Sequence, residues 1–174
     1  LVEDIISLSR LDEGASVMQW GAGDLQDIAE QAAASLAAQA QDAGVSVLVT
    51  GEPVPMEAIP QLLHSIVYNL CDNAIKYNRP GGKVEVQVEA SKQGPLLTVR
   101  DTGIGIPQEE QDRVFERFYR VDKSRSKAVG GTGLGLSIVK HAVLIHRGNL
   151  NLCSTPGEGT AVTVRFPAAA QGKG

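Results

Sequence analysis

The feature that most constrains the fold is one predicted helix, residues 60–78, whose apolar stripe turns polar part-way along. Successive residues of a helix are rotated by about 100°, so Asn69, Asn73 and Lys76 fall within an arc of about 60°. One or two turns earlier the same arc holds apolar side chains, Leu62 and Ile66. The amides therefore continue a stripe that faces the protein, and a second layer must cover this helix.

Half-buried amides need hydrogen-bond partners, because an unpaired one costs roughly 1–3 kcal/mol. Side-chain carbonyl oxygens suit a hard cation such as Mg²⁺, and a lysine suits phosphate oxygens. Alternatively, the two asparagines bond to local backbone and Lys76 is solvated. The helix alone does not decide between these interpretations.

The remaining pattern alternates short strands with helices. Apolar periodicity, caps and glycines predict helices at residues 1–11, 24–42 and 134–146, with Asp24 as an N-cap. Period-two or buried patterns predict the strands, at residues 16–20, 45–50, 83–90, 95–101, 148–155 and 159–167. A hairpin turn near residues 93–94 joins two of them. We expect an α/β two-layer sandwich, with a mixed, largely antiparallel sheet of about five strands packed on three helices.

Composition excludes several classes of function. The net charge of −4 gives no general attraction for nucleic acid or an acidic membrane. Cys71 and Cys153 lie in apolar contexts without metal-ligand spacing, so we expect two reduced core thiols. No apolar run approaches the roughly 20 residues that span a bilayer. The chain begins with Leu in a helical pattern, so we expect a piece of a longer protein.

A second polar motif follows a buried strand. In DTGIGI, residues 101–106, Asp101 ends the strand, and Gly103 and Gly105 allow close approach of the backbone. A carboxylate in this position can accept a hydrogen bond from an exocyclic amine. Taken alone, the motif also suits an ordinary turn.

A third motif, GGTGLGLS at residues 130–137, runs directly into a helix. Exposed backbone N–H groups at a glycine-rich helix N-terminus attract phosphates. The segment is not a P-loop, because no Gly-Lys-Ser/Thr follows. It is not a dinucleotide fingerprint either, because it does not follow a strand of a βαβ unit.

In this order and spacing, the motifs resemble the ATP-binding domain of sensor histidine kinases. The wider superfamily includes type II topoisomerases, mismatch-repair ATPases and heat-shock chaperones, which share the Bergerat fold. The similarity covers about residues 16–167, and its four boxes are NLCDNAIKY, DTGIGI, FERFYR and GTGLGL. DIISLSRLDEG is similar to the end of the second helix of the kinase dimerisation and phosphotransfer domain. The implied domains are a helix remnant at 1–14, the catalytic domain at 15–168 and a flexible tail at 169–174.

The resemblance also implies roles for single residues. Asn73 and Asn69 would hold Mg²⁺, Lys76 would reach a phosphate, and Asp101 would accept from the adenine amino group. Thr160 would support that contact, and Tyr77 would pack beside the adenosine. The implied catalytic residues are Asn69, Lys76, Arg120 and Arg125. The implied nucleotide-binding residues are Asn69, Asn73, Lys76, Tyr77, Asp101, Gly103, Gly105, Ile106, Arg120, Gly131, Thr132, Gly133, Leu134, Gly135, Leu136 and Thr160.

Residues 102–132 are predicted to form a mobile ATP lid. Charged side chains are too dense there for a packed core, and loops of this length are usually functional or mobile. The aromatic residues Phe115, Phe118 and Tyr119 are the exceptions; in the family such aromatics anchor the lid to the domain or to the helical stalk. Most of the lid charges we expect to be solvated.

Asn69 distinguishes a kinase from a hydrolase. ATP hydrolases of the superfamily carry a glutamate general base at this position, and an amide cannot take a proton from water. The resemblance therefore implies transfer of the ATP γ-phosphoryl group to a histidine on an upstream domain, for relay to a response regulator. The isolated chain should bind ATP without phosphorylating itself. Two alternatives remain, a serine-directed kinase of the same fold and a non-catalytic docking module.

The resemblance sets expectations for assembly and location. The full-length protein would be a homodimer through its dimerisation domain, whereas this chain would be monomeric. The domain would be cytoplasmic, in a kinase anchored to the inner membrane. No nucleic-acid partner is expected.

Overall fold

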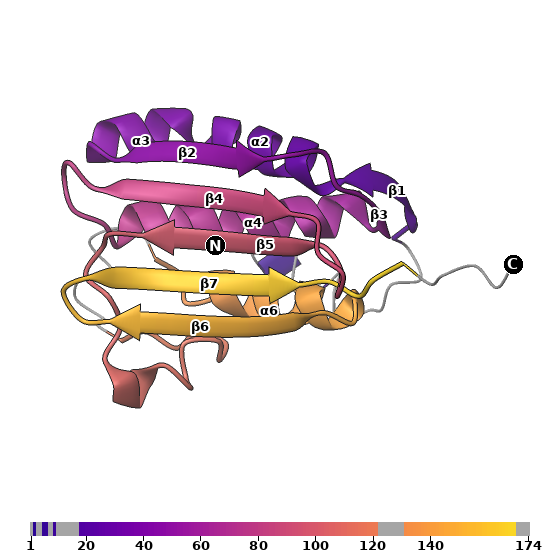
Figure 1. The fold of residues 1–174 in the computed structure, drawn as a ribbon. Helices are drawn as coiled ribbons and strands as arrows, with labels where there is room; N and C mark the ends of the chain where they lie inside the picture. Colours follow the sequence, from indigo (N-terminus) through magenta and orange to yellow (C-terminus); the bar gives the residue numbers. More distant parts are fainter. Residues whose placement is uncertain (1, 3–4, 7–8, 10–17, 122–130, 170–174) are drawn as a thin grey trace, which may run out of the picture.

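A five-stranded sheet forms one layer of the molecule (Figure 1). The computed structural model describes residues 2, 5, 6, 9, 18–121 and 131–169. In spatial order the strands are β2 (Ser46–Gly51), β4 (Lys83–Glu89), β5 (Leu96–Asp101), β7 (Gly159–Arg165) and β6 (Asn149–Thr155). β2 pairs with β4 in parallel and every other neighbouring pair is antiparallel. The mixed, largely antiparallel sheet is therefore confirmed.

The helices form the second layer, behind the sheet in Figure 1. They are α2 (Leu25–Ser35), α3 (Ala37–Ala43), α4 (Pro60–Lys76) and α6 (Gly135–Ile145), with a short 3₁₀ turn η2 (Gln108–Glu110) in the lid. The Asp24 cap is confirmed, because its Oδ1 accepts from the backbone N–H groups of Gln26 and Asp27 at 2.9 and 3.1 Å. The two-layer sandwich is thus the observed architecture.

The single helix predicted over residues 24–42 was wrong. It breaks at Leu36, which leaves the helical conformation with φ −101° and ψ 4°. The Leu36 N–H bonds to Ala33 O at 3.1 Å, and the Ser35 hydroxyl bonds to Ala32 O at 2.6 Å. These i→i−3 bonds close α2 with a tight turn that buries the Leu36 side chain in the core.

A small second sheet joins β1 (Gly21–Asp24) to β3 (Pro55–Ala58) in antiparallel pairing. The strand predicted at residues 16–20 was misplaced: residues 18–20 are not in a strand, and 16–17 lie outside the described residues. β3 was not predicted, because a strand that starts at a proline and has only four residues lacks a clear period-two signal. Its partner β1 is equally short.

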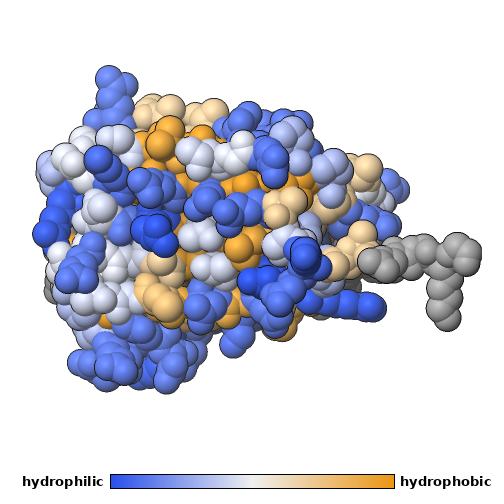
Figure 2. Space-filling view, viewed as in Figure 1, coloured by the Kyte–Doolittle hydropathy of each residue, from blue (hydrophilic) through white to orange (hydrophobic). Residues whose placement is uncertain are grey.

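The core lies between α4 and the sheet. α4 packs against α2 on one side and α6 on the other, and its buried side chains contribute about 1.5–3 kcal/mol each by leaving water. The fully buried side chains at this interface include Leu63, Ile66, Val67, Val84, Val86 and Leu97. The opposite face of the sheet meets solvent, and Figure 2 shows hydrophilic side chains there with apolar ones between them. α4 is therefore held on three sides, which fixes the direction of its polar stripe.

The two cysteines differ in environment. Cys71 is fully buried in α4, and burial raises the pKa of its thiol to about 12. Cys153 is exposed on β6, so the expectation that both are core thiols was wrong for Cys153. Cys153 sits on the alternating strand face that points away from the helices, which a short apolar context did not reveal.

Among the residues that the structure describes, no helix combines the length and the apolar character needed to cross a membrane.

Candidate functional site

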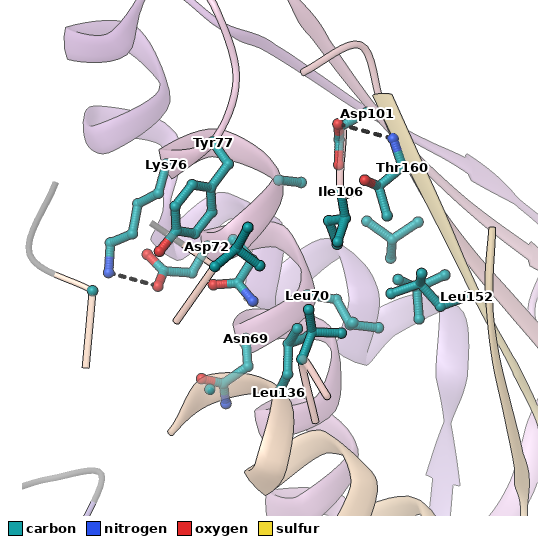
Figure 3. Close-up of a pocket in the computed structure, with 18 of the residues that line it drawn as sticks. Asn69, Leu70, Asp72, Lys76, Tyr77, Asp101, Ile106, Leu136, Leu152 and Thr160 are labelled. Carbon is teal, nitrogen blue, oxygen red and sulfur yellow. Dashed lines mark hydrogen bonds and ion pairs between the residues drawn. The ribbon is translucent and has the colours of Figure 1, made fainter. Parts of the chain in front are cut away.

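A cavity of about 370 Å³ opens between α4, the end of β5, the start of α6 and the lid (Figure 3). Most of the residues predicted for the site line it together. They are Asn69, Asn73, Lys76, Tyr77, Asp101, Gly105, Ile106, Arg120, Gly131, Thr132, Gly133, Gly135, Leu136 and Thr160. Gly103 and Leu134 are not lining residues, and Arg125 lies outside the described residues. Segments far apart in the sequence thus converge on one hollow.

One end of the cavity has apolar walls that the sequence motifs did not reveal. α4, β5, β6 and β7 each contribute aliphatic side chains there, namely Leu70, Ala74, Val99, Leu152 and Val162. Their period-two and helical patterns are those of any core residue, so sequence alone did not distinguish wall from core. The walls suit a flat apolar ring.

Asp101 and Thr160 form the polar group of that end (Figure 3). They are opposite one another in the β5–β7 register, so the sheet itself sets their spacing. Asp101 Oδ1 accepts from the backbone N–H groups of Gly103 at 2.8 Å and Thr160 at 3.3 Å. Burial raises the pKa of the Asp101 carboxyl, and these two hydrogen bonds oppose the rise. With Oδ1 occupied twice, Oδ2 is the oxygen left to accept from a ligand.

Ser154 connects this end to the lid. Its hydroxyl accepts from Ile106 N–H at 2.8 Å and donates to Gly159 O at 3.0 Å. Ser154 Oγ also lies 2.8 Å from Thr160 Oγ1. Since the Ser154 proton is used on Gly159, the Thr160 hydroxyl donates to Ser154 and keeps its lone pairs for a ligand or water. Ser154 was not predicted, because a serine within a strand carries no motif.

The polar stripe of α4 forms the other end. Asn69, Asn73 and Lys76 are half-buried and line the cavity. Asn69 Nδ2 donates to Ser65 O at 2.7 Å, which agrees with the local-backbone alternative for that nitrogen. The carbonyl Oδ1 of Asn69 faces the start of α6, where a Cβ on Gly135 would lie 3.3 Å away. The local-backbone alternative therefore holds for the Asn69 nitrogen, and its carbonyl oxygen, beside the start of α6, is the atom that a cation could use.

Lys76 is engaged by a carboxylate that the motif analysis did not single out. Its Nζ donates to Asp72 Oδ2 at 2.8 Å (Figure 3). Asp72 Oδ1 accepts from Gln39 Nε2, also at 2.8 Å. Asp72 and Gln39 line the cavity too. An i, i+4 Asp–Lys pair was visible in the sequence, but it usually marks only a solvated helix face.

The glycine-rich segment brings backbone close to the same end. Gly133 has φ +76°, and a Cβ there would meet the backbone of Phe118. The N–H of Phe118 donates to Gly133 O at 2.9 Å, which joins the lid to the segment before α6. Among the described residues no side chain caps the start of α6, so its first N–H groups and the positive end of its dipole can face an anion.

Several contacts hold the described part of the lid to the rest of the domain. Arg120 lines the cavity. The Arg113 side chain is 57% exposed, as expected for a solvated lid charge, and its guanidinium lies 4.3 Å from the centre of the Tyr119 ring. Gln111 Nε2 donates to Ile106 O and Ser154 O, both at 2.9 Å, and fastens the start of the lid to the sheet.

The donor set fits Mg²⁺ held mainly by a ligand. No cluster of three or more His, Cys, Asp or Glu side chains occurs within the described residues. Mg²⁺ is commonly held by one or two protein oxygens together with phosphates and waters. Asn69 Oδ1 and the Asn73 amide are oxygen donors of this kind at the polar end.

Comparison with known proteins also indicates an ATP-binding domain. The family model described as "Histidine kinase-, DNA gyrase B-, and HSP90-like ATPase" matches residues 58–170. Sensor histidine kinase RppB of Synechocystis is 36% identical over 170 residues, covering 96% of this chain and 37% of RppB. The phosphate regulon sensor protein PhoR of Pseudomonas aeruginosa is 42% identical over 135 residues, covering 76% of this chain and 30% of PhoR.

Solved structures share the fold. The mycobacterial sensor histidine kinase MprB superposes with a TM-score of 0.74 and 31% identity, covering 86% of this chain and 97% of that one. A full-length ShkA structure in complex with AMPPNP gives 0.81 and 26%, covering 97% of this chain and 36% of ShkA. The chain thus spans well under half the length of the curated relatives named here.

Proposed function

The chain belongs to the histidine kinase-, DNA gyrase B- and HSP90-like ATPase family, as the ATP-binding catalytic domain of a sensor histidine kinase, and from this premise we propose that Mg-ATP binds in the cavity with its adenine at Asp101 and its phosphates along α4. The observation that carries the proposal is the polarity of the cavity. An apolar slot with one acceptor lies at one end, and amides, an ammonium and an uncapped helix lie at the other.

The adenine end supplies recognition. Asp101 Oδ2 would accept from the exocyclic amine, and Thr160 Oγ1 would accept directly or through water. The aliphatic walls exclude water from the ring faces. A guanine carries a carbonyl where adenine carries its amine, so the carboxylate would repel it.

The phosphate end supplies charge. Lys76, Arg120 and the N-terminus of α6 would neutralise the phosphate oxygens, and Arg125 is proposed to join them. Asn73 and Asn69 would hold Mg²⁺, which when bound stabilises negative charge on the phosphates. The contribution of the chain is to position the γ-phosphoryl group and to keep water from it.

The reaction proposed for the full-length protein is phosphoryl transfer to a histidine on an upstream domain. The bond from the γ-phosphorus to its bridging oxygen breaks, a phosphorus–nitrogen bond forms, and ADP leaves. Asn69 stands where a hydrolase would need a general base, which supports slow hydrolysis. The phosphoryl group would then pass to a response regulator.

The domain limits and setting are proposals of the same kind. Residues 15–168 would form the catalytic domain, 1–14 the end of a dimerisation helix and 169–174 a tail. The isolated chain would be monomeric, and the full-length protein a homodimer. We place the domain in the cytoplasm of a membrane-anchored kinase.

Calorimetric titration of Mg-ATP into the chain tests the binding proposal. We expect saturable binding that Asn73→Asp abolishes, because aspartate keeps the size of the side chain and adds charge beside the phosphates. Asn151→Asp is the matched control, since Asn151 is exposed on β6 outside the cavity lining and undergoes the same chemical change. No binding by the unmodified chain would favour the docking module.

Incubation with γ-labelled ATP tests the transfer proposal. The isolated chain should incorporate no label, whereas the full-length protein should carry acid-labile phosphate on histidine. Label on the isolated chain would contradict the need for an upstream acceptor. Acid-stable phosphate on the full-length protein would favour the serine-directed kinase.

A further inference from the structure

A side chain from α3 reaches across to the polar stripe of α4. Gln39 lies near the middle of this short helix, 33 residues before Asp72, and its Nε2 lies 2.8 Å from Asp72 Oδ1. Both residues line the cavity at its polar end. The contact therefore links a surface helix, which carries none of the sequence motifs, to the site.

Asp72 divides its two carboxylate oxygens between different partners. Oδ1 takes the Gln39 amide, and Oδ2 takes the Lys76 ammonium at 2.8 Å. The Asp72 side chain is only 15% exposed and that of Lys76 25% exposed, unlike a solvated surface pair. With one oxygen fixed by Gln39, the carboxylate plane cannot turn freely, and so the direction of the second oxygen is also fixed.

A lysine ammonium has three N–H donors, and Asp72 uses one of them. Within the part of the chain that the structure describes, the two others have no hydrogen-bond partner, so they can bind phosphate oxygens without breaking the ion pair. A free lysine side chain gives up about 2 kcal/mol of rotamer entropy when it is immobilised. A lysine already held in place gives up less of it when the ligand arrives.

We propose that Gln39 is a positioning residue, which acts through Asp72 to hold the Lys76 ammonium ready for the outer phosphates of ATP. The inference rests on the proposed function of the cavity and adds to it a link from α3. Gln39 is the informative residue to change, because it is neutral. Replacing Asp72 would also remove a negative charge beside the phosphates, and the two effects on affinity would oppose each other.

The first test compares two ligands by calorimetry, Mg-ATP and adenosine, which lacks phosphates. In Gln39→Ala we expect affinity for Mg-ATP to fall about fivefold, the typical net effect of one hydrogen bond. Affinity for adenosine should not change. Gln41→Ala is the matched control, since Gln41 is an exposed glutamine of the same helix that does not line the cavity; it should match the unmodified chain for both ligands.

The second test asks whether Gln39 acts through Lys76. In a Lys76→Met background, Gln39→Ala should cause no further loss of Mg-ATP affinity, because the group that it positions is gone.

The outcomes separate the two proposals. Equal losses for Mg-ATP and adenosine would mean that Gln39 only supports the fold, and additive losses in the double variant would mean that it does not act through Lys76. Either result, or no loss at all, overturns the inference and leaves the proposed function standing. If the unmodified chain binds no Mg-ATP, the proposed function itself is overturned, and the inference falls with it.

Discussion

The two ends of the cavity are formed by different kinds of structural element. At the apolar end Asp101 and Thr160 are cross-strand partners where the inner strand β5 ends and β7 begins, and backbone N–H groups hold the carboxylate. At the polar end the groups come from a helix surface, a helix start and the lid. The first end is fixed by main-chain register, whereas the second depends on side chains that hold one another.

This difference matches the two tasks that we propose. A planar base is recognised by the pattern of its donors and acceptors, so an acceptor displaced by about 1 Å no longer makes a good hydrogen bond to it. Phosphates are recognised chiefly by charge, and several donors can share them. A rigid sheet suits the first task, and paired side chains such as Asp72 and Lys76 suit the second.

The largest effect should come from Asp101→Asn. Because Oδ1 already accepts two backbone N–H groups, the asparagine oxygen should keep that place, and its NH₂ should then face the adenine amine. We expect affinity to fall about 100-fold, the upper range for losing a charged acceptor, and by the same factor for Mg-ATP and adenosine. Calorimetry with both ligands measures this.

A matched control sharpens the result. Asp42→Asn makes the same change at an exposed residue of α3, outside the cavity lining, and should leave both affinities unchanged. If Asp101→Asn weakened Mg-ATP but not adenosine, Asp101 would belong to the phosphate end, and the proposed orientation of the nucleotide would be reversed.

Lys76→Met should give the opposite selectivity. Removal of the ammonium should weaken Mg-ATP about 10-fold, within the range for charge-assisted hydrogen bonds. Adenosine should bind as before, because the apolar end does not depend on Lys76. Lys83→Met, at an exposed residue of β4 away from the cavity lining, controls for loss of one positive charge. Weaker adenosine binding in Lys76→Met would show that the two ends are not independent.

Gly133→Ala tests the joint between the lid and the segment before α6. The residue has φ +76°, and the new Cβ would meet the Phe118 backbone, so we expect about 1 kcal/mol less stability in urea unfolding. Mg-ATP affinity should fall modestly, and adenosine affinity should not. Gly157→Ala provides a comparison at positive φ with open space around the Cβ. Equal losses in the two variants would mean that only the backbone conformation matters, and that the Phe118 contact does not.

Much of the architecture could be predicted because the signals were local. Alternating valines in β4 and the amphipathic α4 identified their elements and their buried faces. The break at Leu36 and the strand β3 were missed, because both depend on partners far away: core packing for Leu36 and pairing with β1 for β3. Local propensity cannot report contacts of that kind.

The site divides in the same way. Four site residues could be predicted because they lie in motifs with distinctive residue types, namely Asn69, Asn73, Lys76 and Asp101. Ser154 and Gln39 act through hydrogen bonds to segments distant in the sequence, and nothing in their neighbours marks them. The aliphatic walls could not be predicted for a different reason, since a Val that faces a cavity and a Val that faces the core occupy the same positions in the sequence pattern of a strand.

The smallest effect should appear in stability rather than binding, and it belongs to the apolar end. Burial raises the pKa of the Asp101 carboxyl above its ordinary value of 3.8, so the folded chain holds this proton more tightly than the unfolded chain. Over the window from that value up to the raised pKa, the folded state binds more protons, and the free energy of unfolding therefore falls as pH rises.

Asp101→Asn lacks this titration, so its stability relative to the unmodified chain should rise through the window and stay constant below it. Urea unfolding of both chains from about pH 3 to about pH 7 measures the difference, with Glu85→Gln, an exposed carboxylate on β4, as the reference for losing one acid. A relative stability that does not change with pH would mean that the hydrogen bonds from Gly103 and Thr160 fully offset burial. The apolar end would then hold its charge at no cost to the fold.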